Sequence, residues 1–520
     1  MSDQKNEVKT IYEVKELVAE LPFSQDIFLR IETAKTFIKE NLVEFEAEEA
    51  EMIINVSMKQ HFSLDKDTLN LLKKHYQKCR KEFLIRQKYE DVFDKMSDWY
   101  KVTERGLKFL PGILAYHLAE NEKLIFVNLR YFQYQAGVYR EKSATQVARL
   151  IQDNMLLNES TSYAIYDTER QLQLLVQREE DELNTNKYLI NLKNGLYDVK
   201  KDTFSEHDPN VLSTIQINAC YNSEAECPNF IRFLYESMLG DDDQVKLLQE
   251  IMGYCLIPIT SAQKCFILRG EAAAGKSLFL RVLQEILIGP QNTSNISWQK
   301  MKERFTVAEM KGKLINIFAD LPDGMIDDNG MFKNLVGEDY VPAEKKHKDM
   351  FHFKSTARIL FSCNRMPENR GDHSDGFYRR LLIVPFLNAV PESKRNPNLI
   401  HTFEEEADGI FMFALAGLKR LISQDFKFSE TEVNRNEVQK YRYECNSVAF
   451  FLNSCCEESE TDYIRSKDIY DAYKEFCLQN GCEAFSINQF VPMVKEYFPK
   501  AISAVDPKGQ KRILKGIKFK

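Results

Sequence analysis

One stretch restricts the fold of this chain more than any other. Residues 270–277 read Gly-Glu-Ala-Ala-Ala-Gly-Lys-Ser, after an apolar run at 265–268 and before an amphipathic segment at 278–283. A strand, a glycine-framed loop and a helix N-terminus in this order are typical of a loop that binds the phosphates of a nucleoside triphosphate. The alternative, a chance occurrence in a surface loop, is disfavoured by the flanking strand and helix patterns. The sequence therefore predicts a phosphate-binding loop.

The glycines, the lysine and the serine of this loop each have a chemical role. Gly270 and Gly275 let the backbone turn tightly, so that the N–H groups around Ala274 and Gly275 face phosphate oxygens at the positive end of a helix. Lys276 can reach the β- and γ-phosphates, and the hydroxyl of Ser277 can hold Mg²⁺. We therefore expect ATP and Mg²⁺ as cofactors, with Gly270, Ala274, Gly275, Lys276 and Ser277 around them.

The size and composition of the chain limit the kinds of protein to which this loop can belong. Its 520 residues are enough for two to four domains, and 44% hydrophobic with 28% charged residues is ordinary for a soluble globular protein. The longest apolar run, 409–418, is shorter than the roughly 20 residues of a membrane-spanning helix, and the N-terminus has no apolar signal-peptide core. The 11 cysteines form no C-x2-C pair, so neither zinc nor disulfides are expected. We expect a cytoplasmic protein.

The net charge of −8 restricts how nucleic acid could bind. A protein that coats DNA over its whole surface would be basic, so the basic residues must gather locally. One such cluster lies at 337–353, where two β-prone flanks enclose Lys345, Lys346, His347 and Lys348. Cations on one short turn repel each other, so a hairpin with an anionic ligand at its tip is predicted. A solvated hairpin with ordinary surface lysines is the alternative.

Polar side chains end or precede three further apolar strands. The strand 313–320 ends in Asp320, which suits the second metal-holding motif of a P-loop ATPase, although most such motifs have two acids and this one has Ala319 before Asp320. Asp323 follows three residues later, and a surface carboxylate closing a buried strand is the alternative. The strand 358–364 ends in Asn364, which can hold the attacking water.

An arginine pair, Arg379 and Arg380, directly precedes the third of these strands, 381–386. Arginines at such a place can reach the ATP of a neighbouring subunit as an arginine finger. Taken alone, an arginine pair is more often solvated or ion-paired. The sequence alone does not distinguish an arginine finger from a solvated or ion-paired arginine.

The N-terminal part carries little recognisable chemistry. Residues 1–110 have mostly helical spacing, and Asp65-Lys66-Asp67 is a D-x-D sequence of the kind that a primase would use for metal. Its place before a helical pattern makes a helix N-cap the preferred interpretation. Residues 111–224 read as a mixed α+β region, and the polar stretch 424–440 reads as a linker.

The last segment, 441–520, has the order of a winged helix. Helices are predicted at 466–478 and from Ser486, followed by strands at 501–505 and 512–519. The turn between the strands and the following strand carry Lys508, Lys511 and Arg512. A basic wing on an acidic protein favours contact with DNA phosphates over a merely solvated end.

Taken together, these motifs resemble superfamily 3 helicases of the phage and plasmid primase–helicase type, in particular the replication initiators of staphylococcal pathogenicity islands. The resemblance covers about residues 120–520. The segments that carry it are 194–198, 221–230, the loop 270–277, the strand end at 316–320, the basic turn 345–348, the strand end at 361–364, the segment 376–380 and the winged helix.

This resemblance implies an α/β fold: an AAA+ superfamily 3 P-loop ATPase core at 225–425, with an α+β region before it and a winged helix after it. It also implies a homo-hexameric ring in a bacterial host that moves 3′ to 5′ on DNA, with the basic turn in the pore. In that picture Lys276 and Ser277 bind ATP and Mg²⁺, Asp320 serves the metal or the water, and Asn364 is sensor 1. Arg379 or Arg380 is the finger that acts in trans.

The expected function is that of an ATP-dependent replicative DNA helicase and replication initiator of a phage-related mobile element. Its expected partners are single-stranded DNA, the origin duplex, further copies of itself, and a separate primase or host replication proteins, with no membrane. Two alternatives stay open: a sequence-specific origin-binding protein whose weak ATPase only assembles the ring, and a bifunctional primase–helicase.

Overall fold

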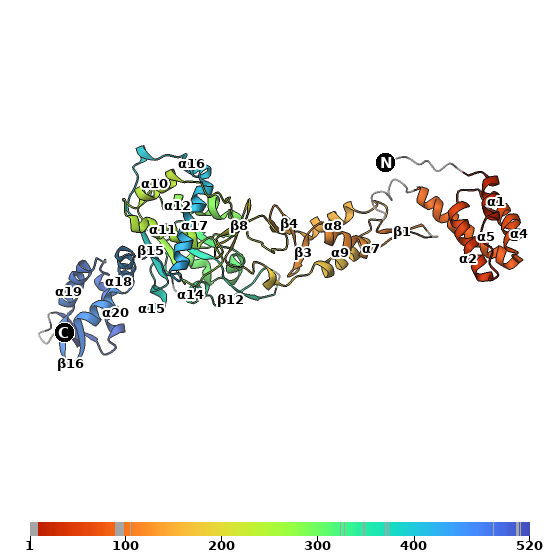
Figure 1. The fold of residues 1–520 in the computed structure, drawn as a ribbon. Coiled ribbons are helices and arrows are strands. Elements are labelled where there is room, and N and C mark those ends of the chain that lie inside the picture. The colour runs from red at the N-terminus through yellow and green to blue at the C-terminus, as the bar shows by residue number, and fades with distance from the viewer. Residues whose placement is uncertain are drawn as a thin grey trace. The chain divides into compact units, whose positions relative to one another are not determined.

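A computed structural model describes residues 9–88, 98–103, 106–322, 324–326, 328–346, 349–369, 372, 374–481, 483–505, 509 and 511–520. The chain divides into two compact units (Figure 1). The first holds residues 1–134 and 140–180, and the second holds residues 135–139 and 181–520.

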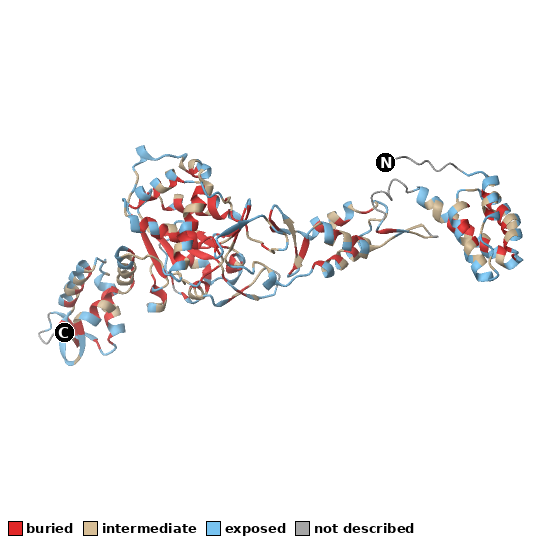
Figure 2. Ribbon diagram, in the orientation of Figure 1, coloured by how far each residue is buried: buried red, intermediate tan, exposed pale blue. Residues whose placement is uncertain are grey.

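A helical bundle forms the beginning of the first unit. Its elements are α1 (Ile11–Ala19), α2 (Ile27–Asn41), α3 (Ala47–Ile53), the π-helical turn η1 (Ile54–Met58), α4 (Lys59–Phe62) and α5 (Lys66–Lys88). Apolar side chains at helical spacing meet in one core, which includes Val14, Ile38, Leu72 and Tyr76. Figure 2 shows buried inner faces and exposed outer faces on these helices. The expected helical N-terminus is confirmed.

The D-x-D sequence lies at the start of α5. The carboxylate Oδ1 of Asp65 accepts the backbone N–H of Thr68 at 2.8 Å. This hydrogen bond satisfies one of the N–H groups that the first turn of a helix leaves without a partner. The preferred interpretation of Asp65-Lys66-Asp67 as a helix N-cap is therefore confirmed.

The rest of the first unit mixes strands and helices. It contains the hairpin β1 (Tyr100–Thr103) and β2 (Gly106–Phe109), then α7 (Pro111–Asn121), β3 (Leu124–Val127), β4 (Arg130–Gln135), β5 (Val138–Lys142), α8 (Ala144–Asp153) and α9 (Ser162–Val176). Trp99, Leu118, Ile151 and Leu172 share its core. The strands predicted at 123–127 and 131–134 are thus present, whereas the β1–β2 hairpin lies in a region where the helical spacing gave no sign of strands.

A parallel five-stranded sheet is the centre of the second unit. Its strand order is β10 (Thr293–Ser294), β11 (Ile315–Phe318), β14 (Arg358–Cys363), β9 (Cys265–Gly270) and β15 (Leu381–Phe386). All of its neighbouring strands run parallel. The three apolar runs with polar ends are therefore strands of one sheet, and the fold is mixed α/β with a parallel sheet.

Both faces of this sheet are covered, as continuous apolar strands require. On β9, Phe266 and Leu268 enter one core, while Cys265 and Ile267 enter the core on the opposite face. The first core includes α10 (Pro228–Ser237), α11 (Asp242–Tyr254) and α17 (Ala407–Ser423), and the second includes α14 (Gly330–Val336). The helices predicted near 228, 245–255 and 408–418 correspond to α10, α11 and α17.

Smaller elements flank the sheet. They are β6 (Leu189–Leu192), β7 (Gly195–Asp198), β8 (Thr203–Ser205), α12 (Lys276–Arg281), the π-helix η3 (Val282–Ile288), η5 (Trp298–Lys302), α13 (Arg304–Val307), β12 (Tyr340–Ala343), β13 (Phe351–Lys354), α15 (Asp375–Tyr378) and α16 (Leu399–Glu405). The antiparallel pair β6–β7 confirms a hairpin at 189–198, with Leu192 opposite Gly195.

The stretch 424–440, predicted to be a linker, is mostly not one. It contains the start of α18 (Glu432–Cys455), whose Asn434 is buried. Asn434 and Gln244 on α11 exchange two amide hydrogen bonds of 3.0 Å, and Nδ2 of Asn434 also donates to the carbonyl of Ile383 on β15. The prediction failed because this helix packs through polar side chains, which read as solvent-exposed in the sequence.

The C-terminal segment begins where α18 bends. Asn446 has non-helical dihedral angles inside α18 (φ −147°, ψ 36°). After it come β16 (Cys456–Arg465), α19 (Ser466–Gln479), α20 (Ile487–Tyr497), β17 (Ile502–Val505) and β18 (Arg512–Phe519). The two helices and two strands agree with the prediction, and Pro492 lies inside α20. Strand β16 completes an antiparallel sheet of order β16-β18-β17 and was missed because its sequence is polar.

Candidate functional site

The predicted phosphate-binding loop joins the buried strand β9 to α12, which continues as η3. A side chain at Gly270 would place its Cβ 2.1 Å from the carbonyl oxygen of Phe386, so only glycine lets β9 and β15 approach this closely. Gly275 has φ +93°, and a Cβ there would lie 2.9 Å from the Phe233 ring. Both glycines are therefore required by the local backbone.

Lys276 is the centre of the site. Its side chain is buried, and Nζ donates hydrogen bonds to the carbonyls of Gly270 (2.7 Å) and Glu271 (2.7 Å) and to Oδ1 of Asn364 (3.0 Å). Burial lowers the pKa of Lys276, and nearby negative groups, among them Asp320, partly offset this. The loop thus holds a desolvated ammonium group among oxygen atoms. Such a group gains from an anionic ligand.

Asn364 and Asp320 reach this place from neighbouring strands. Asn364 directly follows β14, which lies between β11 and β9. Asp320 follows β11, has φ +63°, and donates its backbone N–H to Oγ of Ser362 at 3.1 Å. Because parallel strands end at the same edge of the sheet, the residues after β9, β11 and β14 gather there. Asp323 lies outside the described residues.

Ala319, Asp320 and Ser277 are exposed, unlike the buried Lys276. Ser277 is the second residue of α12, so its hydroxyl lies at the first turn of that helix. Among the parts of the chain that the structure describes, no group of three or more His, Cys, Asp or Glu side chains could hold a metal ion. A metal here would therefore need oxygen atoms from a phosphate ligand besides Ser277 and Asp320, as Mg²⁺ in nucleotide sites does.

The two arginines are at the opposite edge of the sheet. They precede β15, which runs parallel to β9 with Leu381 opposite Cys265, the first residue of β9. Lys276 comes after the last residue of β9. A six-residue strand is about 20 Å long, so the structure does not bring Arg379 or Arg380 to the phosphate-binding loop of their own chain.

Arg379 and Arg380 differ in their surroundings. Arg380 is half-buried and donates from Nη1 to the carbonyl of Gly376, and burial lowers its pKa, as does the neighbouring Arg379. Arg379 is exposed. No side-chain hydrogen bond or ion pair of Arg379 is found among the described residues. Arg379 is thus available to another molecule, whereas Arg380 packs against its own chain.

The predicted basic hairpin is present. Strands β12 and β13 are antiparallel, and Ala343 opposite Phe351 is the last pair before the turn. At the turn, Lys346 is exposed and Lys345 is half-buried. His347 and Lys348 lie outside the described residues.

The basic residues of the C-terminal segment also divide into two groups. Lys511 and Arg512, at the start of β18, are exposed, and Lys508 lies outside the described residues. Further along, Lys518 forms an ion pair of 2.9 Å with Glu457 on β16, and Lys520 donates to the carbonyl of Asn453. Of the residues predicted to contact DNA in this segment, Lys511 and Arg512 are thus exposed beside the β17–β18 turn.

Helix α18 contacts this site in a way that the sequence did not suggest. Arg269, the residue before Gly270, forms ion pairs with Glu437 (3.3 Å) and Glu444 (3.1 Å) of α18. The hydroxyl of Tyr441 donates to the carbonyl of Pro367 at 2.8 Å, three residues after Asn364. The alternation of charges on α18 is the one sequence signal that could have found these contacts.

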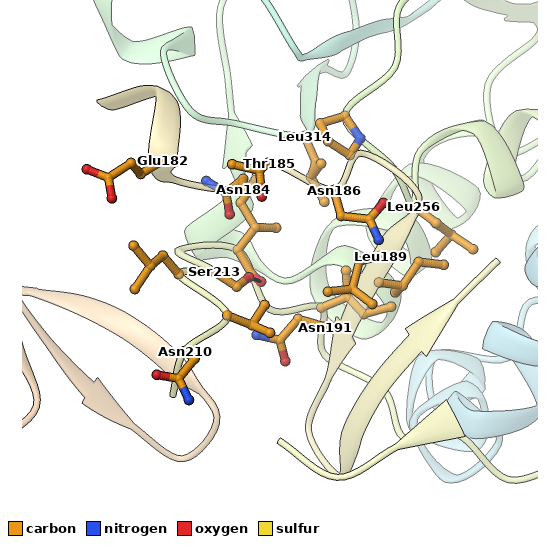
Figure 3. A pocket seen from close by; sticks show the side chains of 16 residues that line it. Glu182, Asn184, Thr185, Asn186, Leu189, Asn191, Asn210, Ser213, Leu256 and Leu314 are labelled. Carbon is orange, nitrogen blue, oxygen red and sulfur yellow. Dashed lines mark hydrogen bonds between the residues drawn. The ribbon is translucent and has the colours of Figure 1, made fainter. Parts of the chain in front are cut away.

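A cavity of about 480 Å³ lies elsewhere in the second unit (Figure 3). Asn184, Asn191, Leu256 and Leu314 are among the residues that line it. Its amides already have partners, since Asn184 donates to Thr214 at 2.8 Å and Asn191 donates to the carbonyl of Gly137 at 2.8 Å. These amides therefore hold the segment 181–217 in place rather than converge on a ligand.

Among the described helices, none contains an apolar segment long enough to cross a membrane.

Three family models match parts of the chain. The model described as "D5 N terminal like" matches residues 70–239, and the model described as "Poxvirus D5 protein-like" matches residues 444–516. Between them, residues 268–380 match a "Family of unknown function (DUF5906)". This last segment contains Lys276, Asp320, Asn364 and the arginine pair.

A curated relative is the "Putative helicase L207/L206" of Acanthamoeba polyphaga mimivirus, which is 26% identical over 216 residues. The match covers 40% of this chain, and the chain spans only 22% of that relative.

Two solved structures of the NrS-1 C terminal region are also similar. Both are apo structures and 12% identical to this chain, and each match covers 78% of this chain and 99% of the other, with TM-scores of 0.48 and 0.47. Residues 70–239 and 444–516, on both sides of the phosphate-binding loop, are thus similar to two families whose descriptions name D5.

Proposed function

We propose that this chain is an ATP-driven DNA helicase that initiates replication of a phage-related mobile element, working as a hexameric ring that moves 3′ to 5′. One observation carries the proposal: Nζ of Lys276, in the loop after β9, lies 3.0 Å from Oδ1 of Asn364, after the adjacent strand β14. The D5-like regions and the relative described as a putative helicase support a replication-related helicase or primase–helicase.

The residues at this edge of the sheet have complementary tasks in the proposal. Lys276 neutralises the β- and γ-phosphates of ATP, while the backbone at Ala274 and Gly275 offers N–H groups to them. Ser277 and Asp320 hold Mg²⁺, and Asn364 orients the water that attacks. Bound ATP and Mg²⁺ supply the phosphoryl group and the charge that its transfer needs.

Arg379 is our candidate for the finger that acts in trans. It is exposed and lies about one strand length from the phosphate-binding loop of its own chain, so it can serve only the loop of a neighbour. Arg380 instead holds the segment before β15 through its bond to Gly376. On these grounds we assign the finger to Arg379, where the sequence left Arg379 and Arg380 equivalent.

DNA is contacted at two places in the proposal. The hairpin with Lys345 and Lys346 holds single-stranded DNA in the pore through phosphates, whatever the sequence, and His347 and Lys348 belong to the same tip. The C-terminal segment acts as a winged helix that recognises the origin duplex, with Lys508, Lys511 and Arg512 on its wing. Its helix-and-sheet arrangement and the exposed side chains of Lys511 and Arg512 support this role.

One observation bears on each of the two alternative functions, the origin-binding protein and the primase–helicase. An origin-binding protein with a weak ATPase is favoured by the single acid at the end of β11, where Ala319 takes the place of a second one. A primase–helicase would use the carboxylates of a D-x-D sequence for metal. The D-x-D sequence of this chain disfavours that function, because Asp65 caps α5. A separate primase or host replication proteins would then supply primers.

DNA-stimulated ATP turnover separates these functions. A helicase should hydrolyse ATP faster when single-stranded DNA is added, and Lys276→Ala should remove both the basal and the stimulated rate. A rate that responds only to origin duplex would favour the origin-binding protein. Primer synthesis on a single-stranded template, assayed in the same preparation, would favour the primase–helicase.

A further inference from the structure

Helix α5 of the N-terminal bundle has two chemically different faces. Leu69, Leu72 and Tyr76 are buried in the bundle core, and Cys79 is buried as well. At 3.6 residues per turn, five lysines fall within about a third of the circumference on the opposite side. This lysine face of α5 consists of Lys66, Lys74, Lys78, Lys81 and Lys88, all of them exposed.

The lysine face runs along the whole of α5. From Lys66 to Lys88 the rise of an α-helix gives a length of about 33 Å. Over that length a DNA duplex presents about 20 phosphates, since it carries one charge per roughly 1.7 Å. Lys74 and Lys81, two turns apart, have no ion-pair partner among the described residues.

Charge is segregated within the bundle rather than mixed. Helix α5 carries eight Lys or Arg side chains and two carboxylates, whereas α1, α2 and α3 together carry seven carboxylates and four basic side chains. Arg80 and Lys73, at the border of the buried face, pair with Glu46 (2.7 Å) and Glu51 (3.8 Å) of the acidic part. The basic residues of these two ion pairs lie beside the lysine face. Lys74 and Lys81 belong to neither pair.

The side chains of the lysine face are better suited to bind phosphate groups than to form an interface with another protein. Protein–protein interfaces are depleted in lysine and enriched in aromatic residues and arginine. The lysine face has neither an aromatic side chain nor an arginine. Polar Asn70 and Gln77 lie among its lysines, together with one carboxylate, Asp67, and one exposed apolar residue, Leu84. Lysine binds phosphate as a point charge without requiring a fixed geometry. Such a face is suited to the backbone of nucleic acid and not to its bases.

We propose that the lysine face of α5 binds the phosphate backbone of DNA without regard to sequence. The N-terminal bundle thereby holds DNA outside the motor and the C-terminal segment. This site lies outside every residue assigned to DNA above, and its action needs no nucleotide.

The test compares two full-length variants that each lose two lysines of the same bundle. K74Q/K81Q changes the lysine face, and the matched control K39Q/K59Q changes exposed lysines on α2 and α4. Binding to a random-sequence 30-base-pair duplex and to a 30-nucleotide single strand is measured without nucleotide over a range of salt concentrations. Circular dichroism and Tm should be the same for both variants, because all four side chains are exposed.

The expected result is a smaller salt dependence for K74Q/K81Q alone. Two lost phosphate contacts lower the slope of log K against log salt by about 1.8 for a duplex and about 1.4 for a single strand. The DNA probe whose salt slope changes by the expected amount, duplex or single strand, identifies the form of DNA that is bound. The same change should appear in a Lys276→Ala background, so the inference can fail while the proposed ATPase stands.

Two results would overturn the proposal. One is an equal slope for K74Q/K81Q and K39Q/K59Q with both DNA probes. The other is an unchanged DNA slope in K74Q/K81Q together with altered sedimentation or lost binding to anionic lipid vesicles, which would assign the lysine face to a second copy of the chain or to a membrane surface.

Discussion

Nζ of Lys276 lies 3.0 Å from Oδ1 of Asn364, although 88 residues separate them in the chain. The contact arises because Lys276 comes after β9 and Asn364 comes after β14, and these strands are parallel neighbours in the sheet. Lys276 and Asn364, which the sequence predicts at the ends of two separate strands, thus form one polar cluster. Their contact is the geometric basis of the proposed ATP site.

Replacing Asn364 by alanine tests this cluster. The variant keeps Lys276 and its two backbone carbonyl partners, but it loses the amide that is proposed to orient the attacking water. We expect kcat for ATP hydrolysis to fall about 100-fold, in the range seen when one positioned polar group is removed from an active site, with a smaller change in KM. Steady-state kinetics would measure both, and an unchanged kcat would remove Asn364 from the mechanism.

Gly270→Ala should damage the loop through sterics alone. The added Cβ would meet the Phe386 carbonyl at 2.1 Å, so β9 and β15 must move apart. We expect a loss of about 1–3 kcal/mol in the free energy of unfolding and weaker nucleotide binding. The matched control is Gly376→Ala, whose nearest contact would be 3.4 Å away. Equal thermal stability of the two variants would contradict this account.

The two arginines should separate in a subunit-mixing experiment. Arg379→Ala and Lys276→Ala proteins, each inactive alone, should regain some ATPase when mixed, because some interfaces then contain both an intact loop and an intact finger. Recovery is measured over a series of mixing ratios, with mixed rings verified. If verified mixed rings show no recovery at any ratio, Arg379 does not act in trans.

Arg380→Ala should behave differently from Arg379→Ala. Removing Arg380 deletes the hydrogen bond to Gly376 and leaves a gap before β15, so we expect a loss of about 1–2 kcal/mol of unfolding free energy. Arg379→Ala should change it by less than about 0.5 kcal/mol, as for other exposed side chains. Chemical denaturation compares them, and the reverse order would mean that their roles are exchanged.

The sequence predicted the sheet and its polar ends well, because the periodicity of buried parallel strands and the glycine-framed loop depend on local residues. It could not distinguish Arg379 from Arg380, since their difference arises from packing around Gly376. It also missed α18 as an element of the core. Glu437 and Glu444 resemble solvent-exposed charges until Arg269, about 170 residues earlier, is seen beside them.

These contacts change where the C-terminal segment should be cut. Deleting residues 447–520 leaves Glu444 and Tyr441 in place, and we expect a folded core that no longer gives a footprint on origin DNA. Deleting 441–520 also removes the ion pair of Glu444 with Arg269 and the hydrogen bond of Tyr441 to Pro367, although Glu437 remains, and should cost about 2–4 kcal/mol more of core stability. Footprinting and denaturation measure the two effects. A footprint that survives the 447–520 deletion would place origin recognition elsewhere in the chain.

Strand displacement tests the central claim most directly. The full-length protein is given ATP, Mg²⁺ and two partial duplexes of the same sequence, one with a 3′ single-stranded tail and one with a 5′ tail, and Lys276→Ala is assayed in parallel. We predict ATP-dependent unwinding of the 3′-tailed duplex and none by the folded Lys276→Ala protein. Unwinding by Lys276→Ala at the parental rate, or ATP hydrolysis by the parent with no displacement of either strand, would contradict an ATP-driven helicase.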